Sequence, residues 1–314
     1  MLELRERPLG RQEARLRLRR ADLAPMAVDA GMRFNVCVAR WPGPIPYFEA
    51  YREVAESVRD GLQRLGHDAR LSTHRIERDR VNILFGVQLL AADRLAKLPP
   101  DTIFYNLEQI PEGPLKPSYH AIGSRFALWD YNKRNGARLQ QLGVARAIYV
   151  PIGYAPVLRR IAPAPRLDID VLFYGLVDDH RGRILEELRR RGLRVEVAQG
   201  VYGATRDTFI ARARVVLNLH LHKTRVFEIV RVSYVLANSK AVVSECGPDT
   251  EIEDDMREAV ALAEYERVAD LCEAVVRDDD RRREYERKGF EVISLRDQSR
   301  ILDDALRKTF ARHG

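Results

Sequence analysis

Residues 215–245 constrain the fold of this chain more than any other segment. They read VVLNLHLHKTRVFEIVRVSYVLANSKAVVSE: an apolar run that ends in polar residues, an amphipathic helical pattern, and a second apolar run. Two buried strands joined by a helix form the repeating unit of a parallel sheet, and ligands of such sheets bind where the strands end. A helix that begins at that edge directs free N–H groups at the ligand and favours an anion. The segment therefore predicts a site for a phosphorylated ligand.

Short β-rich runs alternate with longer helical patterns along the whole chain of 314 residues, which predicts two α/β domains. We expect strands at residues 34–39, 82–85, 102–105, 147–150, 170–175, 194–198, 215–217 and 241–245, and helices at 47–65 and 181–191. The expected units are a basic N-terminal arm at 1–32, a first domain at 33–154, a proline-containing linker at 155–168, a second domain at 169–296 and a last helix at 297–314 that crosses back to the first domain.

The formal net charge of +7 is not concentrated in a way that favours nucleic-acid binding. Residues 1–33 hold eight arginines and five acids, so the surplus over the rest of the chain is small. The sequence shows no stripe of Lys and Arg with interleaved aromatic residues, which nucleic-acid-binding modules carry. An anionic small molecule explains the modest basic excess equally well.

The sequence contains no run of about 18 apolar residues, and its Arg-rich start lacks the apolar core of a signal peptide. We therefore expect a cytoplasmic protein without a membrane span, and its oligomeric state stays open. Cys37, Cys246 and Cys272 lie far apart without the spacing of metal ligands. We expect all three to be reduced structural residues.

Two turns of the second domain carry residues suited to a ligand. Gly175 ends the strand at 170–175, and the helix that starts at Arg181 directs its N-terminus at the same place. Tyr202 and Gly203 follow the next strand, where the aromatic ring could stack on a nucleobase or fill the loop. Each feature alone is equally consistent with an ordinary turn.

Several segments in a fixed order carry a resemblance to a known family. DVLFYG, QGVYG, VVLNLH, VFEIVRVSYVLAN and AVVSE resemble the donor-binding domain of GT-B glycosyltransferases, in particular the bacterial spore-maturation (CgeB-type) and family-one-like enzymes. NILFGVQLL, IFYNLEQI, ALWDYNKRNGARLQQLG and AIYVPIGY resemble the N-terminal half of the same group, so the resemblance covers roughly residues 34–302. It implies two Rossmann-like domains that face each other across a cleft.

The resemblance also implies the substrates. A nucleoside-diphosphate sugar, in the first place a UDP-sugar, is held by the C-terminal domain as a co-substrate, with no tightly bound cofactor and no metal. The acceptor approaches from the N-terminal domain and is a glycan, a protein or a small molecule. Glu228 stands where many such enzymes hold ribose or sugar hydroxyls with a carboxylate, which accepts two hydrogen bonds from a vicinal diol. The alternative is that Glu228 only stabilises the N-terminus of its helix.

Cations and hydrogen-bond donors surround this position. Arg231, at i+3 from Glu228, could pair with it or with a phosphate. Lys223 and Arg225 are candidates for the diphosphate, which gains charge as the glycosidic bond breaks; the alternative is a solvated loop. We interpret Asn218 and His220, like His222, as hydrogen-bonding groups. The two histidines are not expected to bind zinc, because no third ligand can be placed.

Two departures from the better-known retaining enzymes stand out. Those enzymes often carry two glutamates eight positions apart, and here the first of these positions is His220 while the second is Glu228. The anomeric outcome therefore stays open. No convincing metal-binding Asp-x-Asp motif is present, and we interpret Asp178 and Asp179 as a cap for the following helix.

Three residues of the first half are candidate catalytic groups. Glu108 follows the strand at 102–105 and is the leading candidate for the general base, because an inverting displacement needs a group that takes the proton of the acceptor. Asp130 is the reserve base, and His120 lies in a loop that could close over the site. The alternative for Glu108 is that it only caps the next segment.

Two other classes of function remain at this stage. The chain could be a nucleotide- or sugar-phosphate-binding module without catalysis. It could also be an interaction protein in which the basic arm at 1–32 recruits an acidic partner and the α/β core serves as a scaffold.

Overall fold

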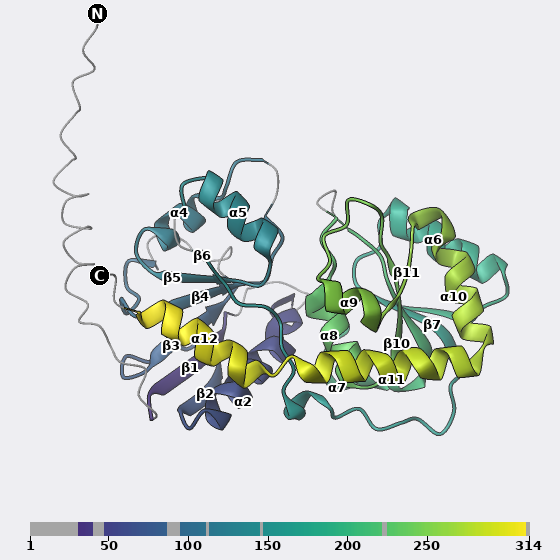
Figure 1. The fold of residues 1–314 in the computed structure, drawn as a ribbon, viewed down its shortest axis with the longest axis horizontal. Helices are drawn as coiled ribbons and strands as arrows, with labels where there is room; N and C mark the ends of the chain where they lie inside the picture. The colour runs from purple at the N-terminus through teal and green to yellow at the C-terminus, as the bar shows by residue number, and fades with distance from the viewer. Residues whose placement is uncertain are drawn as a thin grey trace, which may run out of the picture.

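Two parallel sheets covered by helices make up the computed structural model, which describes residues 31–39, 47–86, 95–110, 113–144, 147–221 and 225–311 (Figure 1). The first sheet has the strand order β2-β1-β3-β4-β5-β6, and the second has the order β11-β10-β9-β7-β8. Every pair of neighbouring strands is parallel. The predicted α/β fold of two Rossmann-like units is therefore confirmed.

The first sheet takes its strands from the first half of the chain. Strands β1, β3 and β4 are almost entirely buried, as expected for strands covered by helices on both faces. The elements are β1 (Arg33–Val38), the 3₁₀ helix η1 (Tyr47–Tyr51), α2 (Arg52–Arg64), β2 (Asp68–Thr73), β3 (Val81–Phe85), β4 (Ile103–Asn106), α4 (Pro117–Gly123), β5 (Ala127–Asp130), α5 (Lys133–Gln141) and β6 (Ala147–Tyr149).

The second sheet follows a stretch that contains one short 3₁₀ helix, η3 (Pro156–Leu158). Its elements are β7 (Ile169–Tyr174), α6 (Asp179–Arg190), β8 (Val195–Ala198), α7 (Gly203–Arg212), β9 (Ala213–Asn218), α8 (Ile229–Ala237), β10 (Ala241–Glu245), α9 (Asp254–Ala259), β11 (Ala261–Ala263), η4 (Tyr265–Arg267), α10 (Val268–Arg277), α11 (Asp279–Leu295) and α12 (Gln298–Phe310).

The structure corrects the predicted elements in two respects. The sequence analysis did not predict β2 (Asp68–Thr73), β5 and β11; of these, β2 is a largely exposed edge strand that lacks a continuous apolar run. The helix expected at residues 47–65 begins as the 3₁₀ helix η1 and becomes α-helical at Arg52. The interpretation of Asp178 as a helix cap is confirmed, since its side chain accepts a hydrogen bond from the Arg181 N–H at 2.9 Å.

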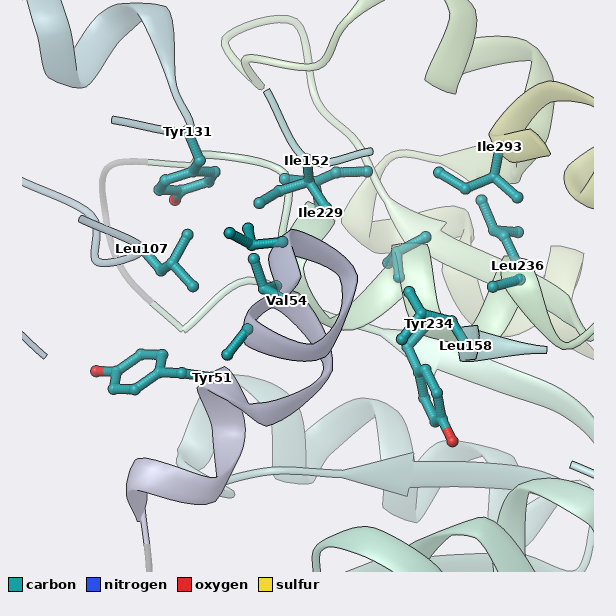
Figure 2. Close-up of a cluster of buried hydrophobic side chains, with 14 of the residues drawn as sticks. Tyr51, Val54, Leu107, Tyr131, Ile152, Leu158, Ile229, Tyr234, Leu236 and Ile293 are labelled. Atoms are coloured by element: carbon teal, nitrogen blue, oxygen red, sulfur yellow. The ribbon is translucent and has the colours of Figure 1, made fainter. Parts of the chain in front are cut away.

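One hydrophobic cluster extends across both halves of the molecule. Figure 2 shows Tyr51 and Val54 near the start of α2, close to Leu107 and Ile152 of the first half and to Ile229 of α8. All five side chains are more than 90% buried. Because burial of apolar area is the main stabilising term in folding, this shared cluster holds the two sheets together.

The chain passes between the two halves twice, and the two crossings are hydrogen-bonded to each other. The Tyr154 N–H donates to the Arg296 carbonyl at 2.7 Å, and the Gln298 N–H donates to the Tyr154 carbonyl at 3.0 Å. After the second crossing, α12 packs on α2, where a Cβ added at Gly61 would lie 2.8 Å from Leu302 (Figure 1). The last helix thus belongs to the core of the first half.

Cys37 and Cys272 are buried free thiols, and Cys246 is a partly exposed one. Within the described ranges, no helix combines the length and the apolar character that a membrane span requires.

Replacement of Leu302 by alanine tests the contribution of α12 to the first half. Leu302 is fully buried, so Leu302→Ala is expected to lower the free energy of unfolding by about 2–5 kcal/mol, the usual range for a leucine removed from a core. Urea denaturation measures this value. The matched control is Asp304→Ala on the same helix, which removes only an exposed ion pair with Lys308 and should change stability by less than about 0.5 kcal/mol. Equal effects of the two variants would contradict the packing role.

Candidate active site

The carboxylate of Glu228 lies between two arginines just before α8. Arg181 donates from Nη2 to Glu228 Oε1 at 2.6 Å, and Arg231 approaches Oε2 with its own Nη2 at 2.6 Å. Of the two partners considered for Arg231, Glu228 or a phosphate, the structure shows the pair with Glu228. The side chains of Glu228 and Arg231 remain 15% and 17% exposed. Since a carboxylate has about four lone-pair sites, Glu228 keeps acceptor capacity for a ligand hydroxyl.

Arg181 is buried, and its guanidinium group donates hydrogen bonds to two backbone carbonyls of neighbouring loops. It donates to the Leu219 carbonyl from Nε at 3.1 Å and from Nη2 at 2.6 Å, and to the Leu176 carbonyl from Nη1 at 2.8 Å. Burial lowers the pKa of Arg181, while the charge of Glu228 raises it. The side chain that was predicted to bind the donor thus joins the loops after β7 and β9 and supports Glu228.

Gly175 directly follows β7 and has a φ of 136°, a conformation that favours glycine. A Cβ at this position would lie 2.8 Å from Nη2 of Arg231. The guanidinium group of Arg231 also lies over the ring of Tyr174 at 5.5 Å and reaches the Asn218 Oδ1 from Nη1 at 3.4 Å. The absence of a side chain at Gly175 therefore makes room for Arg231, which connects the carboxyl ends of β7 and β9.

His220 belongs to a second polar group at the ends of β9 and β10. Its backbone N–H donates to Glu245 Oε2 at 3.0 Å, and its ring Nε2 lies 3.2 Å from the Thr250 hydroxyl. His180 Nε2 lies 3.0 Å from the same oxygen of Glu245. Burial lowers the pKa of His220. Sequence reasoning missed Glu245 and His180, although a carboxylate at the end of a buried strand was a usable signal.

No group of three or more His, Cys, Asp or Glu side chains within the described residues has the arrangement to hold a metal ion.

The other residues that were predicted to bind the nucleotide sugar are more dispersed. Arg225 is half-exposed with a φ of 48°, and its Nη1 lies 3.5 Å from Asp249. Tyr202 occupies the N-cap of α7, which begins at Gly203. Lys223 and His222 lie outside the described residues.

Asp130, the reserve base, is fully buried at the end of β5. Its carboxylate accepts hydrogen bonds from Asn106 Nδ2 at 2.7 Å, from the Asn132 N–H at 2.8 Å and from Asn135 Nδ2 at 3.1 Å. Burial raises the pKa of Asp130 to about 7, although these hydrogen bonds lower it. The Asn106 and Asn135 amides also donate to the Glu108 carbonyl at 2.8 Å, so Asp130 orders the loop that carries Glu108.

Glu108 of the first half and Glu228 of the second half both lie near Tyr131. Tyr51 donates a hydrogen bond from its hydroxyl to Glu108 Oε1. Burial, followed by the negative charges of Asp130, Glu108 and Glu228, raises the pKa of Tyr131, so this tyrosine lies within the electrostatic reach of both halves. By contrast, His120 is exposed on α4.

A cavity of about 580 Å³ lies between the two halves, and Tyr131 and Ile229 are among the residues that line it. Hydrogen bonds join the halves in this region: Gln109 Nε2 donates to the Val226 carbonyl at 3.4 Å, and the Arg134 N–H donates to Glu251 Oε1 at 3.2 Å. The Tyr149 hydroxyl also donates to Glu253 Oε1. The cavity is lined by Tyr131, Asn132, Lys133, Phe227, Ile229, Glu251, Ile252, Glu253, Asp254, Asp255, Met256 and Arg296.

The buried Asp130 should make stability depend on pH. Its pKa is raised from 3.8 to about 7 in the folded protein, so its contribution to folding is complete below about pH 4 and is lost as the pH rises through about 7. Asp130→Asn removes this dependence. Urea denaturation should show the stability of the wild type falling relative to the variant, by up to about 1.4 kcal/mol per pH unit in this window.

The control for this comparison is Asp280→Asn, whose side chain is 98% exposed. It should follow the wild type at every pH. A constant difference in stability between the wild type and Asp130→Asn would show that Asp130 does not titrate in this range.

Comparison with known sequences gives little overlap. No protein-family model matches the chain. A relative among curated proteins is the uncharacterized protein L138 of Acanthamoeba polyphaga mimivirus, which is 32% identical over 104 residues. The match covers 31% of this chain and 12% of the viral protein, so the chain spans about an eighth of that relative.

Solved structures show the fold. HepE of Anabaena, in complex with UDP and glucose, matches with a TM-score of 0.57 and 11% identity over 88% of this chain and 99% of its own. BGT of phage T4, in complex with UDP-glucose, matches with a TM-score of 0.55 and 11% identity over 90% of this chain and 100% of its own. TarM of S. aureus matches with a TM-score of 0.53 and 15% identity over 74% of this chain and 55% of TarM. The chain therefore has the GT-B fold, and the predicted resemblance is confirmed at the level of the fold.

Proposed function

We propose that this protein is a glycosyltransferase that uses a nucleoside-diphosphate sugar. The observation that carries the proposal is the Glu228 carboxylate, which is held by Arg181 and Arg231 at the carboxyl edge of the second sheet and stays 15% exposed. Ligands of open parallel sheets bind outside this edge. A partly exposed carboxylate with an adjacent guanidinium group suits a ligand that carries both hydroxyls and phosphates.

Within this proposal, Glu228 accepts hydrogen bonds from the ribose or sugar hydroxyls of the donor. Arg231 and Arg225, together with Lys223, pair with the diphosphate. Their positive charges stabilise the leaving group most strongly in the transition state, when the glycosidic bond is breaking. Asn218 contributes by holding Arg231 in place through its side-chain oxygen.

Glu108 is the proposed general base of the acceptor side. Its side chain is partly exposed near the boundary of the two halves, whereas Asp130 is fully buried. A base must reach the acceptor proton within hydrogen-bond distance, and this requirement favours Glu108. We infer that residues 33–154 act as the acceptor side and residues 169–296 as the donor side, and that the reaction needs no metal.

The comparisons support a uridine nucleotide as the donor group. TarM was crystallised with UDP, HepE with UDP and glucose, and BGT with UDP-glucose. The identities of 11–15% relate these proteins to the chain only through the fold, so the nucleotide is part of the proposal.

A thermal-unfolding screen against UDP, GDP, CDP, dTDP and their sugar conjugates tests the donor class. At 100 times its dissociation constant, a ligand stabilises the native state by about 2.7 kcal/mol, which gives a clear rise in melting temperature. We expect a selective rise with UDP or UDP-sugars that persists in EDTA. No response to any nucleotide would contradict the proposal, and a response that EDTA abolishes would contradict metal independence.

Two variants test the residues of the donor site. Arg225→Ala removes a half-exposed cation and should weaken UDP binding about tenfold, while Glu228→Gln should abolish sugar transfer or donor hydrolysis and leave the protein folded. Glutamine retains an oxygen that can accept the hydrogen bond from Arg181. Isothermal calorimetry and donor consumption are the measurements.

The control for Arg225→Ala is Arg283→Ala, which removes a cation of similar exposure from α11. It should leave UDP affinity unchanged. Wild-type binding and turnover in both Arg225→Ala and Glu228→Gln would rule out the assigned donor site.

A further inference from the structure

An ion pair buried between the two halves joins α2 to α7. Arg206 of α7 donates from Nη2 to Glu53 Oε1 of α2 at 2.7 Å, and the two side chains are 5% and 7% exposed. The same nitrogen of Arg206 lies 3.0 Å from Asp207 Oδ1 of its own helix. A buried charge needs a counter-charge inside the protein. The guanidinium group of Arg206 is therefore held in place in part by a carboxylate of the other half.

This guanidinium group also packs against aromatic rings of the second half. Its central carbon lies 4.6 Å from the centre of the Tyr234 ring and 5.8 Å from the centre of the Tyr174 ring. A guanidinium group within about 6 Å of a ring centre is attracted to the ring, and more strongly where water is excluded. Arg206 thus links Glu53 of the first half to Tyr174 of β7.

Tyr174 is also a ring against which Arg231 lies. The central carbon of the Arg231 guanidinium group is 5.5 Å from the ring centre, and the Tyr174 hydroxyl donates to the Arg231 carbonyl at 3.4 Å. Burial raises the pKa of Tyr174 to about 12, although the charges of Arg206 and Arg231 lower it. Both guanidinium groups therefore act on this phenol, which stays neutral at physiological pH.

The contacts form a continuous path from the first half to the carboxylate on which the proposed function depends. Arg231 completes the path, because its Nη2 lies 2.6 Å from Glu228 Oε2. The side chains along the path are buried or nearly buried. In a closely packed interior, displacement of one side chain is transmitted to the next. The position of Arg231 thus depends on a contact that the first half makes.

We propose that Glu53 and Arg206 are positioning residues for the nucleotide sugar. Glu53 holds Arg206 against Tyr174, and Tyr174 holds Arg231 where it can pair with the diphosphate. The inference rests on the proposed function, because that function assigns the diphosphate to Arg231. It follows that the first half contributes to the affinity for the nucleotide through a side chain that does not touch it.

The affinity of the full-length protein for UDP tests this inference by isothermal calorimetry. Glu53→Gln keeps the shape and an acceptor oxygen but removes the charge, while Arg206 keeps Asp207 as a counter-charge. We expect UDP to bind about three- to tenfold more weakly, the usual size of a coupling through packed side chains. The matched control is Glu49→Gln, because Glu49 pairs with Arg52 of its own half. It should bind UDP as the wild type does.

A double-mutant cycle separates positioning from a general loss of structure. If Glu53 acts through Arg231, Glu53→Gln combined with Arg231→Ala binds UDP no more weakly than Arg231→Ala alone. Effects that multiply would show that Glu53 acts by another route and would overturn the inference. Thermal unfolding checks that the variants are folded. If Glu53→Gln does not fold, Arg206→Lys replaces it, since lysine keeps the charge but lacks the planar group that lies against the rings.

A readout without ligand distinguishes failure of this inference from failure of the proposed function. The tyrosines are labelled with fluorotyrosine, and the fluorine resonance of Tyr174 is identified by its loss in Tyr174→Phe. We expect this resonance to shift in Glu53→Gln and to keep its position in Glu49→Gln.

Each outcome then has one meaning. If UDP binds but Glu53→Gln leaves its affinity unchanged, or weakens it without a shift of the Tyr174 resonance, the inference is overturned and the donor proposal stands. If no nucleotide binds to the wild type, the proposed function fails. A shifted resonance then still supports the path from Glu53 to Tyr174, and an unshifted one overturns it.

Discussion

A guanidinium group buried from water must find its counter-charge inside the protein, and the second half of this molecule is organised around that requirement. Arg181 is 1% exposed, and it draws the Leu219 carbonyl, the Leu176 carbonyl and the Glu228 carboxylate to one point. Removal of one partner from a buried ion pair strands the other, which is strongly destabilising. The position of Glu228 therefore follows from the folding of the sheet edge, before any ligand is considered.

The boundary between the two halves combines a core with a site. On one side, the hydrophobic cluster around Val54 and Ile152 excludes water and joins the sheets (Figure 2). On the other side, a cavity is left between Tyr131 and Glu251, and single hydrogen bonds join the halves there. The same boundary thus contains both the cluster that holds the two sheets together and a cavity large enough for a small molecule.

The sequence predicts those parts of the site that depend on local pattern. Gly175, Asn218 and Glu228 were identifiable because buried strands and a helix place them at one sheet edge. Their partners were not identifiable, since contacts across tens of residues depend on packing. Asp130 illustrates the limit: it has the position of a base, but amides from two other segments surround it. Edge strands such as β2 were missed because their exposed faces remove the apolar pattern.

The packing of α12 on α2 has a consequence for synthesis. Leu302 is fully buried in the first half of the molecule, but the ribosome adds it only after every strand of the second sheet. The apolar face of α2 therefore stays uncovered while the whole second sheet is made. Exposed apolar surface on a nascent chain invites aggregation. Completion of the first half is thus coupled to synthesis of the second sheet, and a chain truncated before α12 would lack a wall of its N-terminal core.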